Sequence, residues 1–168
     1  MSTENLNNED AIAKLRELVN KIDVGMLCTY PANETYVHTV PMSRQEVDEQ
    51  GNIWYLFSSE SETYANLKVN DKISILFSQV SDYNFLSLNG VAEVSQDKER
   101  IEKYWSKFVE AWFEKGKEDP HIRILKVKVK DAHYWDNKTN KLGTFLKLAA
   151  SVVSGQKLDI GREGDLNV

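Results

Sequence analysis

The stretch from residue 51 to residue 77, GNIWYLFSSESETYANLKVNDKISILF, constrains the fold more than any other part of the chain. It opens with a turn glycine, and the run at 53–57 contains only apolar residues, most of them β-branched or aromatic. An unbroken run of this kind predicts a strand that is buried on both faces. A second apolar run at 73–77 predicts another strand, and residues 64–69 between them predict a short helix.

Hydroxyl and carboxyl side chains fill the turn before this helix, where the sequence at 58–63 reads SSESET. Ser59 and Glu62 have the spacing of a capping box, which predicts that the helix begins here. A hydroxyl-rich turn at a helix N-terminus is also typical of sites that bind a phosphate group. The neighbouring carboxylates of Glu60 and Glu62 would repel a phosphate, so the residues alone favour the cap over the anion pocket.

Before this stretch, apolar residues at helical spacing predict an amphipathic helix over 8–22, and strands are predicted over 24–30 and 36–44. Pro41 lies inside the second strand, which indicates an edge strand or a bulge with backbone groups free for a ligand. Cys28 lies in the first strand, and no base that would activate its thiol is evident, so we interpret it as a small buried residue.

After this stretch, alternating apolar residues predict long strands over 83–94 and 121–134, and a last helix is predicted over 142–153. Gly90 in the first of these strands indicates a bulge or a close backbone approach. Residues 97–115 predict a helix with an unusually aromatic stripe, which contains Ile101, Trp105, Phe108 and Trp112. This stripe predicts either core packing or a more specific role, as a subunit interface or as the wall of a cofactor site.

Length and composition suit one soluble domain over 1–168, with a flexible start at 1–9 and a polar tail at 156–168. The net charge of −5 argues against a nucleic-acid partner. One cysteine and three scattered histidines offer neither a disulfide nor the spacing of a metal site. No signal peptide and no apolar run near the ~18 residues of a membrane span is present, so we expect a cytoplasmic protein.

The predicted order is helix, three strands, short helix, two strands, helix, strand, helix. Strands that are mostly adjacent and antiparallel predict an α+β fold that is mainly β, a small closed barrel with helices around it. A function does not follow from this fold.

Four motifs together resemble the flavin-binding split-barrel family typified by pyridoxamine 5′-phosphate oxidase, over about residues 12–153. They are HTVPM at 38–42, WYLFSSESET at 54–63, AHYWD at 132–136 and YWSKFVEAWFEKGKEDP at 104–120. The last motif is most similar to the general stress protein 26 branch of the family. The resemblance implies a split β-barrel of antiparallel strands flanked by helices.

The resemblance also implies a homodimer that binds FMN, or FAD or another flavin, in a groove between the two chains. Matching positions place His38, Thr39, Val40 and Met42 along the flavin ring and ribityl chain. They place Phe57 and Ser58 at the flavin, and Ser61 and Thr63 near its phosphate. Trp135 would reach the ring from the other subunit. No catalytic residue and no metal ligand follows from the match.

The sequence departs from the family pattern at two points. The phosphate position has Ser61-Glu62-Thr63, without the usual cation, so that Lys68, Lys72 or Arg44 would have to replace it. The substrate-binding Arg-x-His of the oxidase has no counterpart after Trp135. We therefore expect a flavin-binding stress protein, with a redox role on an unidentified substrate, that does not oxidise pyridoxamine 5′-phosphate. The alternative is a non-enzymatic flavin carrier or sensor, or an empty barrel that serves interaction.

Overall fold

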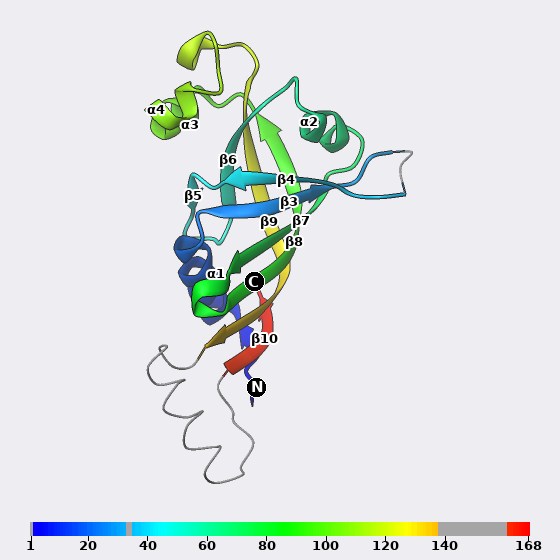
Figure 1. Ribbon diagram of the computed structural model, residues 1–168, viewed down its shortest axis with the longest axis vertical. Coiled ribbons are helices and arrows are strands. Elements are labelled where there is room, and N and C mark those ends of the chain that lie inside the picture. The colour runs from blue at the N-terminus through cyan, green and yellow to red at the C-terminus, as the bar shows by residue number, and fades with distance from the viewer. Residues whose placement is uncertain (1, 33–34, 138–160) are drawn as a thin grey trace.

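The computed structural model describes residues 2–32, 35–137 and 161–168, and most of these belong to one sheet (Figure 1). Its strands are β1 (Ser2–Thr3), β2 (Leu6–Asn7), β3 (Val24–Thr29), β4 (His38–Ser43), β5 (Glu46–Val47), β6 (Ile53–Ser58), β7 (Lys72–Gln79), β8 (Asn84–Ser95), β9 (Ile122–Asn137) and β10 (Gly161–Asn167). The α-helices are α1 (Asn8–Lys21), α2 (Glu62–Leu67), α3 (Lys98–Tyr104) and α4 (Lys107–Glu110), with 3₁₀ turns at η1 (Val80–Asp82) and η2 (Gly116–Glu118).

The sheet is built around β9, which pairs with β8, β6 and β10 along its 16 residues. From β8 the order continues through β7 and β3 to β4, and all of these neighbours are antiparallel. Within the described ranges no ladder joins β4 to β6, so the sheet stays open. The mainly β fold with flanking helices is confirmed, and the closed barrel predicted from strand order alone is wrong.

Two apolar clusters lie on the two faces of β6, which explains why its sequence is apolar without interruption. Ile53, Tyr55 and Phe57 pack into the larger cluster, together with the buried face of α1 and the inner faces of β7 and β8. Trp54 packs on the opposite side, in a smaller cluster that α3 and α4 cover. In Figure 1, α2, α3 and α4 lie at one end of the sheet, while α1, β10 and both termini lie at the other. The strand predicted to be buried on both faces is confirmed.

Gly90 marks a register shift between β8 and β9, as its position in an alternating strand predicted. A Cβ atom at Gly90 would lie 2.6 Å from the carbonyl oxygen of Lys128, so only glycine permits this approach of the two backbones. Pro41 likewise lies in an edge strand, because the described residues pair β4 with β3 alone.

The single helix predicted over 97–115 is wrong. The chain leaves helical geometry at Trp105 and Ser106, and the Ser106 hydroxyl then accepts a hydrogen bond from the backbone N–H of Val109 at 3.3 Å. A serine in this position caps a new helix, so two short helices, α3 and α4, replace the expected long one. The aromatic stripe is divided between them and the turn that follows.

Both ends of the described chain differ from the flexible start and polar tail that the sequence predicted. Residues of β1 and β2 pair in parallel with β10, and β10 pairs with the last residues of β9. The polar sequence GREGDLN does not predict a strand, but the neighbouring strands supply hydrogen-bond partners for its backbone. The helix predicted over 142–153 lies outside the described residues. No helix in the described ranges is long and apolar enough to cross a membrane.

The Tyr55 hydroxyl is fully buried and has no hydrogen-bond partner among the described residues. Burial raises the pKa of this hydroxyl well above its usual range. A buried, unpaired polar group costs about 1–3 kcal/mol, so we expect Tyr55→Phe to raise the free energy of unfolding by about 1 kcal/mol or more. Urea denaturation followed by circular dichroism measures the change.

Tyr134 provides the matched control for this substitution. It is also fully buried, but its hydroxyl donates a hydrogen bond to the Glu4 carbonyl at 2.9 Å. Tyr134→Phe should therefore lower the free energy of unfolding by about 1 kcal/mol. Equal losses in both variants would show that the Tyr55 hydroxyl has a partner after all.

Candidate functional site

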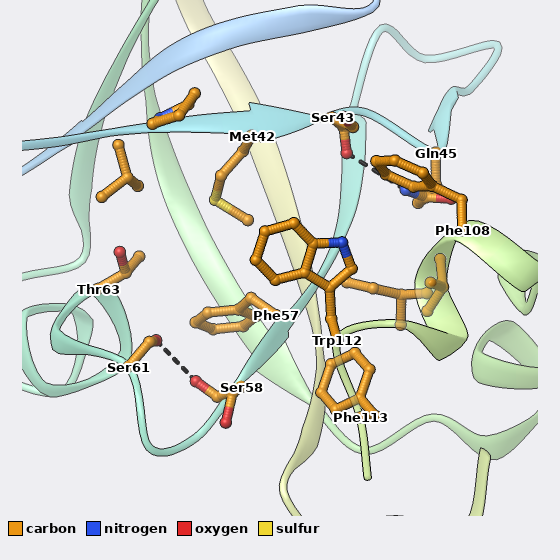
Figure 2. A pocket seen from close by; sticks show the side chains of 14 residues that line it. Met42, Ser43, Gln45, Phe57, Ser58, Ser61, Thr63, Phe108, Trp112 and Phe113 are labelled. Carbon is orange, nitrogen blue, oxygen red and sulfur yellow. Dashed lines mark hydrogen bonds between the residues drawn. The ribbon is translucent and has the colours of Figure 1, made fainter. Parts of the chain in front are cut away.

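A cavity of about 330 Å³ opens between the edge strand β4, the end of β6, the serine turn and α4 (Figure 2). Most of its wall is apolar and much of it is aromatic. The lining residues are Val40, Pro41, Met42, Ser43, Gln45, Leu56, Phe57, Ser58, Ser61, Thr63, Phe108, Val109, Trp112 and Phe113. We call this cavity the aromatic pocket.

The edge strand β4 forms one wall of the aromatic pocket. Val40 and Met42 are partly buried and pack against the main core, and Pro41 between them is exposed. The Cα register places Val40 opposite Leu27, and Met42 opposite Gly25. A Cβ at Gly25 would lie 2.7 Å from the Phe77 ring, so a residue without a side chain is required behind this wall.

The serine turn forms the floor, and its hydroxyl groups are already engaged in the turn itself. The Ser61 hydroxyl donates to the Ser58 carbonyl at 2.7 Å, drawn in Figure 2, and accepts from the backbone N–H of Tyr64 at 3.2 Å. Ser61 is thus the N-cap of α2, whereas the capping box predicted at Ser59 is wrong by two residues. A cap is confirmed in this turn, and Thr63 follows it in a buried position on the pocket side.

Aromatic side chains from α4 and the following turn form the opposite wall. Phe113 is buried and packs against Trp105 with ring centroids 6.2 Å apart, which is core packing. Phe108 and Trp112 are instead 65% and 73% exposed. In Figure 2 the Trp112 indole projects into the pocket towards Met42 and Phe57. Part of the predicted aromatic stripe therefore belongs to the core, and part of it lies open at the pocket.

The lining residues of the aromatic pocket include no Asp, Glu, His, Lys, Arg, Cys or Tyr. The described side chains around it thus offer hydroxyl and amide groups but no general acid or base and no cation. No group of three metal-ligating side chains occurs in the described ranges. Its lining is suited to contact with a flat apolar ring.

Most of the residues that the sequence assigned to a cofactor site meet at this pocket, namely Val40, Met42, Phe57, Ser58, Ser61 and Thr63. Thr39 does not line it, because alternation along β4 turns its hydroxyl towards the Cys28 sulfur, at 3.3 Å. His38 lies beside α2 instead, with Nε2 3.3 Å from a Glu62 carboxylate oxygen. Trp135 is on β9 and packs against His133, with ring centroids 4.5 Å apart.

Sequence reasoning missed several residues of the pocket wall, including Ser43, Gln45, Leu56 and Val109. Gln45 donates from Nε2 to the Ser43 carbonyl at 3.3 Å, and this hydrogen bond holds the Gln45 side chain at the end of β4. Leu56 gave no signal, because in an uninterrupted apolar strand no residue stands out. Gln45 could have been found as the first amide after the edge strand.

The comparisons with known proteins agree with this architecture. A family model described as "Pyridoxamine 5'-phosphate oxidase like" matches residues 10–159. The chain belongs to this family. One of the solved structures that resemble this chain is also described as a member of the pyridoxine phosphate oxidase family.

A general stress protein 26 from Jannaschia sp. CCS1 superimposes with a TM-score of 0.80 at 20% identity, over 95% of this chain and 99% of that one. The general stress FMN/FAD binding protein of Xanthomonas citri gives a TM-score of 0.66 at 25% identity, over 79% and 93%. Protein bli-3 of Neurospora crassa is 27% identical over 124 residues, which are 68% of this chain and 59% of that protein. This chain therefore spans less than two thirds of the curated relative. The split-barrel fold of the pyridoxamine 5′-phosphate oxidase-like family is shown.

Proposed function

We propose that this protein binds a flavin, FMN or FAD, with the isoalloxazine ring in the aromatic pocket and a second copy of the chain completing the site. The observation that carries the proposal is the aromatic pocket itself. It joins the apolar wall of an edge strand to an exposed tryptophan, in a family whose relative from Xanthomonas citri is described as FMN/FAD binding.

The residues present fit the ring of a flavin. Met42, Phe57 and Trp112 can contact a planar ring from its faces and edges, and Ser43 and Gln45 can hydrogen-bond to its polar edge. The described residues pair β4 on one side only, so backbone N–H and C=O groups of β4 add a second set of donors and acceptors. The cavity is at the lower end of the range of about 300–1,000 Å³ for ligand pockets, which suits one part of a large cofactor.

The phosphate end of the cofactor fits the pocket less well. Its described lining residues contain no cation, and the Ser61 hydroxyl both donates and accepts within the turn. Thr63 remains as a neutral contact from this chain, and the Ser58 hydroxyl, which accepts from the backbone N–H of Glu60 at 3.1 Å, can still donate a hydrogen bond. Because charge-assisted bonds are about twice as strong as neutral ones, we expect the ring to supply most of the affinity.

The outer face of the sheet provides the surface for the second copy. Met26 is directly opposite both Pro41 and Leu76, which gives an apolar row across β4, β3 and β7. Met26 and Leu76 are 42% and 48% exposed, and Val24 on the same face is 47% exposed. A contiguous exposed apolar face of this kind is typical of a subunit interface.

Trp135 lies on the same outer face of the sheet, since Leu76 is opposite Ser87, Ser87 is opposite His133, and Trp135 follows His133 by two residues. It does not line the pocket of its own chain. A homodimer formed through this face would carry the Trp135 of each chain towards the other, as the family resemblance predicts.

A bound flavin would supply redox chemistry, and the protein would position its ring and exclude water from it. The absence of a titratable group among the described lining residues favours electron or hydride transfer over reactions that need an enzymatic acid or base. The same observation favours the second candidate function, a flavin carrier or sensor without catalysis.

Titration with FMN, FAD and riboflavin, followed by flavin fluorescence, tests the proposal. We expect Trp112→Ala to weaken flavin binding about 10-fold, because one stacked aromatic side chain contributes about 1–1.5 kcal/mol. Trp112 is 73% exposed, so its removal should leave the fold intact. Comparison of FMN with riboflavin measures what the phosphate adds.

Tyr36→Ala is the matched control, since Tyr36 is 82% exposed and does not line the pocket. It should bind flavin like the unchanged protein. Failure of all three flavins to bind at micromolar concentration would overturn the proposal. Where flavin binds, its bleaching by NADPH favours the oxidoreductase, and a flavin that NADPH does not reduce favours the carrier.

A further inference from the structure

A second cavity, of about 400 Å³, is lined in part by the α2 region and shares no lining residue with the aromatic pocket. Tyr64 and Lys68 of the α2 region form one wall, and Arg123 of β9 forms another. Ser95 and Gln96, at the end of β8, complete the polar part of the lining. We call this cavity the cationic cavity.

Both cations of the cavity lie near the ring of Tyr64. The Lys68 ammonium lies 5.9 Å from the centroid of the Tyr64 ring, and the Arg123 guanidinium lies 5.6 Å from it. Both distances are within the range in which a cation is attracted to a ring face. The Tyr64 ring in turn packs against Phe57, at 6.1 Å between centroids, so its position is supported from the core.

Arg123 is held by neutral groups instead of a carboxylate. Its Nη1 donates to the carbonyls of Pro120 and Ile122, both at 2.8 Å, and Gln96 Nε2 donates to the same Pro120 carbonyl at 3.0 Å. These bonds use one of the three guanidinium nitrogens. Among the described residues, neither Arg123 nor Lys68 forms an ion pair with an acidic side chain, whereas the lysines at 103, 117 and 128 do.

The charge of the cavity is opposite to that of the chain. The protein contains 26 acidic and 21 basic residues, yet none of the residues that line this cavity is Asp or Glu. Neither cation has an acidic partner among the described residues, and a bound anion would give both of them charge-assisted hydrogen bonds. The fork of donors on Arg123, the ammonium of Lys68 and the neutral donors beside them match the several acceptor oxygens of a phosphate group.

We propose that the cationic cavity is a binding site for a phosphate group, either free phosphate or the phosphate monoester of a small molecule. Lys68 and Arg123 are the binding residues, Tyr64 holds them together, and Gln96 orients Arg123 through the Pro120 carbonyl. The site is separate from the proposed flavin site, since the two cavities have no lining residue in common, although Tyr64 of one packs against Phe57 of the other.

Isothermal titration calorimetry of the full chain with inorganic phosphate, at constant ionic strength, tests the proposal. We expect Lys68→Gln and Arg123→Gln each to weaken phosphate binding about 10-fold, and the double variant to abolish it. Lys72→Gln removes an exposed lysine that does not line the cavity, and it should bind phosphate like the unchanged protein. Lys68 is exposed, so its variant should fold even if the Arg123 variant does not.

A parallel titration with phenyl phosphate distinguishes the two sources of the phosphate group. Equal affinities indicate a site for free phosphate, and an affinity for the monoester at least 10-fold higher indicates a small phosphorylated molecule. Phosphate binding that Lys68→Gln leaves unchanged would overturn the proposal. So would binding of an acidic peptide in preference to both phosphates, which would make this cavity a protein-docking surface.

Discussion

Replacement of Asp136 by Asn is expected to lower the free energy of unfolding by about 3–5 kcal/mol, the largest effect that we expect from one substitution. The reason is that Asn keeps the shape of the side chain but removes its charge, and it leaves the Lys14 ammonium, which is 6% exposed, with only the more exposed Glu17 carboxylate at 3.0 Å. Removal of one member of a buried ion pair costs this amount because the remaining charge stays desolvated. Chemical denaturation in urea measures the difference.

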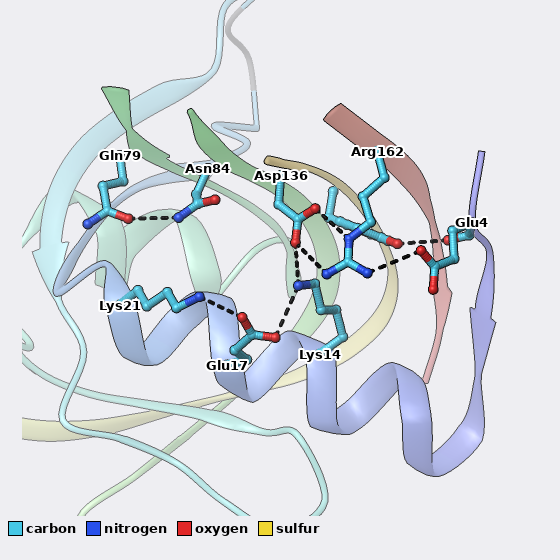
Figure 3. Close-up of polar contacts among 9 residues, drawn as sticks. Glu4, Lys14, Glu17, Lys21, Gln79, Asn84, Asp136 and Arg162 are labelled. Atoms are coloured by element: carbon cyan, nitrogen blue, oxygen red, sulfur yellow. Dashed lines mark hydrogen bonds and ion pairs between the residues drawn. The ribbon is translucent and has the colours of Figure 1, made fainter. Parts of the chain in front are cut away.

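The network around Asp136 joins three parts of the fold that are distant in sequence (Figure 3). Its carboxylate, on β9, accepts from Lys14 of α1 and from Arg162 of β10, with Arg162 Nε at 2.6 Å and Nη2 at 3.1 Å. Arg162 also donates to the Glu4 carboxylate at 3.2 Å. The Asp136 carboxylate thus binds two cations, and both are held in place by packed elements. We expect that no neighbouring residue can replace this carboxylate.

The contribution of Asp136 should depend on pH in a defined direction. Burial alone would raise the pKa of this carboxyl, but the hydrogen bonds and charges of Arg162 and Lys14 outweigh burial and hold the pKa below its usual range. A lowered folded-state pKa adds stability that is fully present above the unfolded value of about 3.9 and is lost as the pH falls through the folded value. The difference between the unchanged protein and Asp136→Asn should therefore be constant near pH 7 and shrink below about pH 4.

Glu93→Gln is the control, because Glu93 pairs with Lys128 at 2.5 Å on the exposed face of the sheet. Surface ion pairs are screened by solvent, so this change should be far smaller than that of Asp136→Asn. A similar loss in both variants would mean that burial does not govern the strength of the Asp136 network.

The double variant Met26→Asp with Leu76→Asp should convert the proposed dimer into a monomer at micromolar concentration. The two side chains face each other across β3 and β7, so both introduced carboxylates would lie at the centre of the apolar row. Burial of unpaired charge in an interface should raise the dissociation constant by a factor of at least about 100. Light scattering after size-exclusion chromatography measures the mass of the particle.

Val69→Asp adds a carboxylate to another exposed apolar residue, 64% exposed, which lies just beyond α2. This control should remain dimeric. A single-chain mass for the unchanged protein would contradict the proposed flavin site between two chains and the role that we propose for Trp135. A monomeric double variant that still binds flavin normally would show that one chain suffices for the aromatic pocket.

Patterns that act over a few residues were sufficient to predict much of the fold. Alternation along β8 and β9 and the unbroken run in β6 reflect burial on one face or on two, which is a local property of the sequence. Pro41 marked an edge strand because its missing N–H excludes a central position. That β4 and the serine turn meet at one pocket was implied only by the family resemblance, and the structure brings them together there.

The features that sequence reasoning missed depend on contacts between distant residues. Strand β10 has the composition of a loop, and it becomes a strand only because β9 and the N-terminal residues offer it partners. Ser106 divides the predicted helix, since its hydroxyl supplies a cap and the aromatic residues after it have two different surfaces to cover. Local periodicity predicts neither the formation of β10 nor the division of the helix at Ser106.

The candidate site was predicted best where it depends on strand geometry and least where it depends on side-chain direction. The family resemblance assigned Val40, Met42 and Thr39 to the site together, and only Val40 and Met42 line the pocket, because alternation along β4 turns Thr39 towards Cys28. The Ser61 hydroxyl was assigned to a phosphate, but it completes the turn and caps α2. Trp112 could be recognised as a surplus of aromatic area, but only its 73% exposure separates it from the buried Phe113.

The pairing of β1 and β2 with β10 has a consequence for the order of events during protein synthesis. Asn5 accepts a hydrogen bond from the backbone N–H of Asp165, which lies 160 positions later. Strands β1 and β2 therefore cannot pair with β10 until almost the whole of this sequence has left the ribosome. A translation product interrupted before Gly161 would expose these segments together with the Lys14 and Asp136 charges that Arg162 helps to balance. We expect such truncated products to be degraded more quickly than a product that includes β10.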